Sequence, residues 1–309
     1  MNTKVTIGLC VKDAATVVKT AFRSISIQDY PHELIKIVIV DDGSSDNSLS
    51  LAMEFAQKSD IKTFVTSSQG KGLGATRQIA VDNAEGDYIV WVDDDLVLSK
   101  DFIRNEIEFM EKNPTIGAAQ GNYVPITLNT AIGLIEYANS AYAPSARANL
   151  KRIGTGGSVF RLRALESAGG FDVRIQGAGE DLDVSRRIRE SGWALAAVST
   201  AGFSMKYPPA TLKALTKKHY WYGYGNHFLY HKYKDQWLLN EYFPPVALLL
   251  GLKSSYSIWR ATSKKKGFFF VALHFIITIA RYRGFIRSHL DAYGHANNIR
   301  GHDSAQLSQ

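Results

Sequence analysis

The sequence predicts an α/β protein with a Rossmann-like, mostly parallel central sheet flanked by helices, followed by a helical, membrane-associating C-terminal extension. First, β-branched runs alternate with amphipathic stretches early in the 309 residues, as in a doubly wound sheet. Second, residues 1–205 hold 21 Lys and Arg against 25 Asp and Glu, whereas residues 206–309 hold 15 against 4. Third, most long apolar runs lie in the basic part. We therefore expect two regions, 1–205 and 206–309.

The expected strands are short apolar runs, and the continuous run at residues 35–42 is typical of a parallel strand buried on both faces. They lie at residues 5–11, 35–42, 61–66 and 88–92. The stretches between them place apolar residues at helical spacing. We expect helices over residues 14–28, around Leu49 to Ala56, over 74–84, and from about residue 180. A Gly-rich loop at residues 154–160 is expected to enter a further strand.

The chain contains a single cysteine, Cys10, so no intrachain disulfide can form, which fits a reducing compartment. The opening stretch MNTKVTIGLCVKD has an apolar core too short for a secretory signal and no small-residue cleavage pattern. We expect it to form the first strand of a cytosolic domain.

Acidic residues follow two of the expected strands. Asp41 and Asp42 end one run, and Asp93, Asp94 and Asp95 end another. Ligands of such sheets bind beyond the carboxyl ends of the strands, so these acids and Cys10 are expected on one edge. Adjacent like charges are costly unless solvent separates them or a cation lies among them. The sequence therefore predicts either a solvated turn or a site for Mg²⁺ or Mn²⁺, which prefer oxygen ligands.

Over residues 3–200 the chain resembles the family 2 glycosyltransferases. The resemblance rests on the first strand and its loop, VDDGSSDNS, DDD after an apolar strand, and GGFD followed by GEDLDVSRRIRESGW. It implies the GT-A fold and transfer of a sugar from a nucleoside-diphosphate sugar, with inversion at the anomeric carbon. The expected activity is that of a hexosyltransferase in polysaccharide biosynthesis, with a UDP-sugar as donor and a glycan or polyprenyl-linked hydroxyl as acceptor.

The resemblance implies several contacts with the nucleotide. Asp42 is expected to contact the nucleobase, and Asp41 to support the loop beside it. Lys71 and Arg77, in SSQGKGLGATRQIA, are candidates for the diphosphate, although a solvated role fits each equally well. Cys10 lies where the family's first strand meets the nucleobase, but it could equally be a small buried hydrophobe.

The triple aspartate matches the family's Asp-x-Asp motif. The resemblance assigns the metal, Mn²⁺ or Mg²⁺, to Asp93 and Asp95, with Asp95 as the direct ligand. Asp94 is then expected to face the ribose of the nucleotide or the protein. A divalent cation would offset the carboxylate repulsion and the charge that builds on the departing diphosphate.

Inversion requires a base opposite the leaving nucleotide that removes the proton of the acceptor hydroxyl. The resemblance assigns this role to Asp181, with Glu180 as a supporting or acceptor-orienting acid. The alternative is that both acids only complement the positive end of a helix that starts there.

Three further residues are expected to contact sugars. GTGGSVFR resembles the family's loop beneath donor sugar and acceptor, so Gly156 and Gly157 would let a sugar approach the backbone; ordinary turn chemistry explains them nearly as well. Trp221 could stack on an acceptor sugar. The surrounding stretch lacks the Gln-x-x-Arg-Trp motif of processive, membrane-embedded relatives, so we expect no synthesis and secretion of a long polymer.

Basic residues flank the apolar runs of the C-terminal region, which favours anionic lipid over nucleic acid as its partner. Residues 268–280 are apolar but would span only about 20 Å as a helix, against a hydrocarbon core of about 30 Å. The run at 242–252 is shorter still. We expect in-plane or re-entrant helices at the cytoplasmic face of the cell membrane; a soluble helical appendage or a dimer interface is the alternative.

Two other functions are alternatives to glycosyl transfer. A nucleotidyltransferase also uses an α/β domain and carboxylate-bound metal, but LCVKDAATV lacks the Gly-rich activation loop of that class. A non-catalytic, membrane-bound scaffold that retains the fold would be marked by loss of the acids, and all of them are present.

Overall fold

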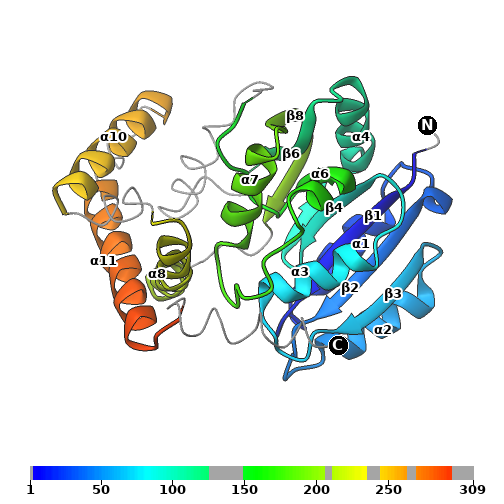
Figure 1. Cartoon of the computed structure of the whole chain (residues 1–309), viewed down its shortest axis with the longest axis horizontal. Helices are drawn as coiled ribbons and strands as arrows, with labels where there is room; N and C mark the ends of the chain where they lie inside the picture. Colours follow the sequence, from blue (N-terminus) through cyan, green and yellow to red (C-terminus); the bar gives the residue numbers. More distant parts are fainter. Residues whose placement is uncertain (1–2, 125–148, 206–210, 235–243, 263–268, 294–309) are drawn as a thin grey trace. The chain divides into compact units, whose positions relative to one another are not determined.

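The computed structural model describes residues 3–124, 149–205, 211–234, 244–262 and 269–293 (Figure 1). The chain forms two compact units. The first consists of Met1–Ile126, Ser140–Gln176 and Glu180–Tyr207. The second consists of Thr127–Asn139, Gly177–Gly179 and Pro208–Gln309. The expected boundary near residue 206 lies outside the described residues.

The first unit is built on an eight-stranded sheet with the order β3-β2-β1-β4-β7-β6-β8-β5. The strands are β1 (Val5–Val11), β2 (Ile35–Asp41), β3 (Lys62–Ser67), β4 (Tyr88–Asp93), β5 (Leu96–Leu98), β6 (Ile116–Tyr123), β7 (Ser158–Arg161) and β8 (Ala194–Met205). Strands β1 to β4 pair in parallel, as do β6 and β8, whereas β7 pairs antiparallel with β4 and β6, and β5 with β8. Four of the seven pairings are parallel, so the sheet is mixed, with an all-parallel part formed by β1 to β4.

Helices cover both faces of this sheet (Figure 1). They are α1 (Val18–Ser26), α2 (Ser48–Lys58), α3 (Leu73–Asp82), α4 (Phe102–Lys112), α6 (Leu162–Ser167) and α7 (Glu180–Glu190), with a 3₁₀ turn at His32–Leu34. Apolar side chains of α1, α2 and α4 pack with alternate strand residues on one face. Those of α3, α6 and α7 pack on the other, against strand residues such as Val40, Trp91 and Phe160. The unit is a three-layer sandwich.

The alternation of side chains along β1 explains why both faces are covered. Ile7 and Leu9 are fully buried in the cluster with α1, and Cys10 lies in the cluster with α3. Burial of both faces requires a continuous apolar run. Gly8 is part of the same run, and a Cβ there would lie 2.5 Å from the ring of Trp91, so only glycine fits beneath that side chain.

The described part of the second unit contains three helices: α8 (Leu212–Tyr233), α10 (Pro244–Thr262) and α11 (Phe269–Leu290). Helices α8 and α11 cross closely at two glycines. A Cβ on Gly223 would lie 1.9 Å from the carbonyl oxygen of Arg281, and a Cβ on Gly284 equally close to that of Tyr220. No described helix is long and apolar enough to cross a bilayer. Residues 242, 243 and 268 of the two apolar runs, and Lys264 to Lys266, lie outside the described residues.

Candidate active site

The acidic edge of the first unit is organised around a buried arginine. Arg77, on α3, donates from Nη2 to Asp93 Oδ1 at 2.9 Å and from Nε to Glu180 Oε1 at 3.3 Å. Its guanidinium carbon lies 4.9 Å from the centre of the Trp91 ring, an arrangement favourable for a cation over an aromatic face. The side chain is only 3% exposed. Arg77 therefore joins the triple aspartate to the first acid of α7.

The position of Arg77 follows from the helix that carries it. The buried residues of α3 include Thr76, Arg77 and Ala80, so this part of the helix faces the sheet. Nη1 is also buried and has no hydrogen-bond partner among the described residues. The sequence predicts that Arg77 approaches the diphosphate of a donor; the structure gives its other two nitrogens carboxylate partners within the protein. It acts here as an internal counter-ion for two acids.

Burial shifts the ionisation of the two acids at the start of α7. It raises the pKa of Glu180, with the charge of Asp181 adding to the effect and that of Arg77 opposing it. Burial likewise raises the pKa of Asp181, against a hydrogen bond from the Leu182 amide at 2.7 Å. Acids that only complement a helix dipole are held in the charged form. Burial here favours the neutral form of both groups instead, and the role of Asp181 as the base stays a prediction.

The Gly-rich loop at residues 154–157 lies against these acids. A Cβ on Gly156 would lie 2.4 Å from Asp93 Oδ2, and one on Gly154 would lie 3.8 Å from Asp181 Oδ2. Gln120, in the middle of β6, holds this loop because its side chain accepts from the Gly154 amide at 3.2 Å and donates to the Gly156 carbonyl at 3.3 Å. The loop therefore brings backbone close to both carboxylates.

Gly157 differs from Gly156 in what it contacts. It has a positive φ of 66°, and a Cβ there would lie 2.5 Å from the ring of Phe203. Its carbonyl accepts from the Gly121 amide at 2.9 Å, and its amide donates to the Trp91 carbonyl. These contacts explain why glycine occupies this position; its contact with a sugar stays a prediction.

Asp41, the last residue of β2, and Asp42, which follows it, hold two loops at the same edge. Asp41 Oδ2 accepts from the amides of Gly43 and Ser44. Asp42 Oδ1 accepts from Ser68 Oγ at 2.6 Å and from the Gly72 amide at 2.9 Å. Both aspartates are buried.

Asp42 is kept ionised although it is largely removed from solvent. Burial alone would raise the pKa of its carboxyl, but hydrogen bonds from Ser68, Gly72 and Lys12 outweigh this and lower the pKa below its usual value. Lys12 Nζ lies 3.1 Å from Asp42 Oδ2. The Asp42 carboxylate is therefore both held in one orientation and negatively charged, at the edge of the sheet where the parallel strands end.

The remaining predicted residues have different surroundings. Asp94 and Asp95 are half-buried in the turn after β4. Burial, with the charges of Asp95 and Asp93 adding to it, raises the pKa of Asp94 to about 7. Lys71 is exposed in the loop before α3. Burial raises the pKa of the Cys10 thiol to about 12, and its side chain belongs to the apolar cluster around Trp91, as expected of a small buried hydrophobe.

Trp221 belongs to the second unit, where it is 42% exposed on α8. A Cβ on Gly177, a residue of the same unit, would lie 3.3 Å from the indole nitrogen of Trp221, so the indole packs over this glycine. An exposed indole is a suitable surface for a sugar ring. Its stacking on an acceptor sugar stays a prediction.

Sequence reasoning missed the residues that support these acids. Gln120, which holds the Gly-rich loop, and Trp91, whose ring lies against the guanidinium group of Arg77, were not predicted to belong to the site. Helical spacing was the available signal for Arg77, because it places residues 73, 77 and 80 on one face of α3 and so turns the arginine inward. No comparable signal marks Gln120, since its role depends on the pairing of β6 with β7.

The fold and this acidic edge define a GT-A type of transferase domain, and comparison with known proteins agrees. Residues 6–166 match the model of glycosyl transferase family 2, and residues 88–282 that of glycosyl transferase family group 2. The first match covers more than half of the chain. The protein belongs to glycosyl transferase family 2.

Curated relatives are similar over part of their length. A poly-β-1,6-N-acetyl-D-glucosamine synthase of Staphylococcus epidermidis is 28% identical over 186 residues, which are 58% of this chain and 44% of the synthase. The poly(ribitol-phosphate) β-N-acetylglucosaminyltransferase TarS of Staphylococcus aureus is 28% identical over 90 residues, 29% of this chain and 16% of TarS. The chain spans about half the length, or less, of these relatives.

Solved structures share the fold at low sequence identity. The mannosyltransferase PcManGT of Pyrobaculum calidifontis, in complex with GDP-Man and Mn²⁺, superposes with a TM-score of 0.66 at 16% identity, covering 94% of this chain and 88% of that one. TarS 1-349 of S. aureus in complex with UDP gives a TM-score of 0.55 at 14% identity, covering 94% and 92%.

Proposed function

We propose that this chain is a metal-dependent, inverting glycosyltransferase. It would move a sugar from a nucleoside-diphosphate sugar, with uridine as the carrier, to a hydroxyl of a glycan or polyprenyl-linked acceptor. The observation that carries the proposal is the buried Arg77 joined to Asp93 and Glu180, with Asp181 beside them. The names of the related synthase and of TarS, and the complex of TarS with UDP, support a UDP-sugar as donor.

The aspartates at the end of β4 and in the turn that follows suit a divalent cation. They supply only carboxylate oxygens, which Mn²⁺ and Mg²⁺ prefer. Burial raises the pKa of Asp94 to about 7, and the charges of Asp95 and Asp93 add to this effect; a divalent cation would offset their repulsion. Asp95 and Asp93 would hold the ion, which neutralises charge on the leaving diphosphate when bound. The Mn²⁺ complex of PcManGT supports this assignment.

Asp181 is proposed as the base. In a single displacement it takes the proton of the acceptor hydroxyl, the acceptor oxygen bonds to the anomeric carbon, and the bond from that carbon to the diphosphate breaks. Its raised pKa favours proton uptake, and its place beside Gly154 leaves backbone rather than a side chain next to Oδ2. Glu180 and Arg77 are proposed as positioning residues for Asp181 and Asp93.

The nucleotide is proposed to lie across the loops after β2 and β3. Asp42 presents an ionised carboxylate for a nucleobase N–H, and Asp41 holds its loop. Lys71 forms no ion pair with a described residue and is exposed, so it remains available for the diphosphate. Asp94 is assigned to the ribose. Gly156 and Trp221 are proposed to contact sugars, and Cys10 to fill space beneath the site.

The second unit is proposed to bind the cytoplasmic face of the cell membrane without crossing it. Large apolar side chains are exposed along α10 and α11; they include Leu249 at 66%, Tyr256 at 58% and Leu290 at 73%. The same region carries the basic excess of the chain, which attracts anionic lipid. Flotation of the protein with vesicles containing phosphatidylglycerol tests this, with Leu249→Ser as the variant and the exposed Met53→Ser of the first unit as control. Recovery of the wild type in the vesicle-free fraction would refute it.

The catalytic proposal is tested by product analysis. The protein is incubated with UDP-GlcNAc, an N-acetylglucosamine oligosaccharide and Mn²⁺, and UDP release is measured with and without chelator. We expect UDP release that the chelator abolishes. Pyrophosphate formed from UTP and a sugar phosphate would indicate a nucleotidyltransferase instead. Neither product from UDP-, GDP- or dTDP-sugars would indicate a non-catalytic scaffold.

A further inference from the structure

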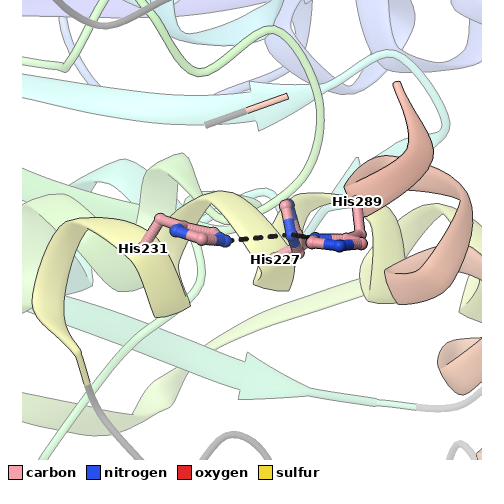
Figure 2. Close-up of side chains that lie close together, drawn as sticks. All are labelled: His227, His231 and His289. Atoms are coloured by element: carbon pink, nitrogen blue, oxygen red, sulfur yellow. Dashed lines mark hydrogen bonds between the residues drawn. The ribbon is translucent and has the colours of Figure 1, made fainter. Parts of the chain in front are cut away.

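Three histidines converge in the second unit, outside the site described above. His227 and His231 lie one turn apart on α8, and His289 lies on α11 (Figure 2). Their nearest nitrogens all lie within 4.8 Å of one another. His227 is fully buried, His231 is half-buried and His289 is exposed. The cluster is thus anchored in the interior of the unit and open on one side.

The surroundings of His227 determine which of its nitrogens carries the proton. Nδ1 lies 2.7 Å from the carbonyl oxygen of Tyr293 and 3.1 Å from Ser288 Oγ; because the carbonyl can only accept, the shorter contact is a hydrogen bond only in the tautomer with a proton on Nδ1. In the neutral form of this tautomer, Nε2 carries the lone pair of the ring. A histidine whose other nitrogen donates to a backbone carbonyl is the usual form of a metal ligand, because that bond fixes both tautomer and ring orientation.

The electron pair on His227 Nε2 faces two further ring nitrogens. His231 Nε2 lies at 3.1 Å and His289 Nδ1 at 3.3 Å. One electron pair accepts one well-aligned hydrogen bond, so N–H donors cannot satisfy both contacts equally. In a tetrahedral zinc site, bonds of about 2.0–2.1 Å place neighbouring ligand nitrogens roughly 3.3 Å apart. The distances from His227 Nε2 to the other two nitrogens, 3.1 and 3.3 Å, are close to this spacing between ligand atoms.

The helices hold these rings with little freedom. The close crossing at Gly223 and Gly284 sets α8 against α11 one turn or so before the histidines. The Phe285 ring packs edge-on against His227 with centroids 4.8 Å apart. His231 and His289 lie in the last turns of α8 and α11, where the negative ends of the helix dipoles favour a cation.

We propose that His227, His231 and His289 form a binding site for a divalent transition metal of the zinc type, which joins the ends of α8 and α11. Imidazole ligands suit zinc, nickel and copper, whereas the carboxylates after β4 suit magnesium and manganese. The chain would therefore hold two chemically distinct cation sites. None of the three histidines is among the residues proposed for sugar transfer, so the two proposals can be tested separately.

The test is titration of the metal-free, full-length protein with ZnCl₂ by calorimetry, and with CoCl₂ by visible absorption. The Asp95→Ala background removes a ligand proposed for the other cation. We expect one Zn²⁺ per chain, a higher Tm, and the visible bands of four-coordinate Co²⁺. His231→Gln and His289→Gln, which change side chains that are not fully buried, should each weaken zinc binding by at least about tenfold.

The matched control is His274→Gln, which lies on α11 about 22 Å along the axis from His289 at 1.5 Å per residue. It should bind zinc as the wild type does. Far-ultraviolet circular dichroism of each variant establishes that it is folded. The proposal is overturned if the wild type binds no Zn²⁺ at micromolar concentration. It is equally overturned if His231→Gln and His289→Gln bind Zn²⁺ with wild-type affinity.

Discussion

The buried arginine of the acidic edge gives the most quantitative prediction. Replacing Arg77 by Met keeps most of the apolar volume but leaves Glu180 without its cation. Both partners are buried, with side chains 3% and 5% exposed. Removing one partner of such a pair costs about 3–5 kcal/mol of the free energy of unfolding, because it leaves an uncompensated charge or forces proton uptake.

The other contacts of Arg77 contribute less to the free energy of unfolding. Asp93 is 40% exposed, so solvent screening reduces that pair to about 0–1 kcal/mol. The contact with Trp91 contributes about 0.5–2 kcal/mol. Since such terms are not additive, we expect a total loss of about 3–5 kcal/mol for Arg77→Met, and partial recovery when Glu180→Gln is added.

The assay is urea unfolding of the nucleotide-free protein, followed by fluorescence. Arg104→Met is the matched control, because Arg104 also pairs with an aspartate, Asp29, but with side chains 41% and 29% exposed. Arg104→Met should lower the free energy of unfolding by less than about 1 kcal/mol. The reasoning is refuted if Arg77→Met costs no more than Arg104→Met. A weaker affinity for UDP without loss of stability would instead favour direct contact with the diphosphate.

Three further predictions concern single residues. Asp181→Asn should lower the rate of sugar transfer by about 10²–10⁴-fold while leaving the Kd for UDP unchanged, measured by coupled assay and calorimetry; an unaltered rate would remove Asp181 as the base. Gly156→Ala places a methyl group 2.4 Å from Asp93 Oδ2 and should weaken Mn²⁺ binding, whereas Gly202→Ala, with its nearest neighbour at 3.7 Å, should not. Burial raises the pKa of Glu106 well above its usual value, so its contribution to stability is complete below the unfolded pKa of about 4.3 and is lost as the pH rises through the folded pKa. Glu106→Met should therefore raise the free energy of unfolding at pH 8 by about 1–3 kcal/mol and reduce its fall between pH 4 and 8; equal pH dependence of both proteins would contradict this.

The parallel half of the sheet could be predicted from sequence because its strands are continuous apolar runs. Strands β1, β2 and β4 begin and end within one residue of the predicted positions. Helix α1 begins at Val18 rather than at residue 14, because the amide of Val17 bonds to the Ala14 carbonyl in a turn.

The other half of the sheet could not be predicted in the same way. Strands β6 and β8 read IGAAQGNY and ALAAVSTAGFSM, and such Ala, Gly and Ser residues have little intrinsic preference for strands. They form strands because they pair with each other and, through β6, with β7. Helix α4 was missed although Phe102, Ile103, Ile107 and Met110 show helical spacing.

The same contrast holds for the candidate site. Acids at the ends of strands could be located from sequence, since parallel strands bring their carboxyl ends to one edge. The partners of these acids depend on packing between distant segments, as when Arg77 on α3 meets Glu180 on α7. The spacing of His227 and His231 was visible in the sequence, but His289 joins them only through the crossing of α8 and α11.

The central claim is that the acids after β4 bind a nucleoside diphosphate through a divalent cation. Calorimetry of UDP binding, with Mn²⁺ and with chelator, to the intact protein and to Asp95→Ala tests it most directly. The account predicts UDP binding that requires Mn²⁺ and is lost in Asp95→Ala. UDP binding of equal affinity in chelator, or in Asp95→Ala, would contradict it.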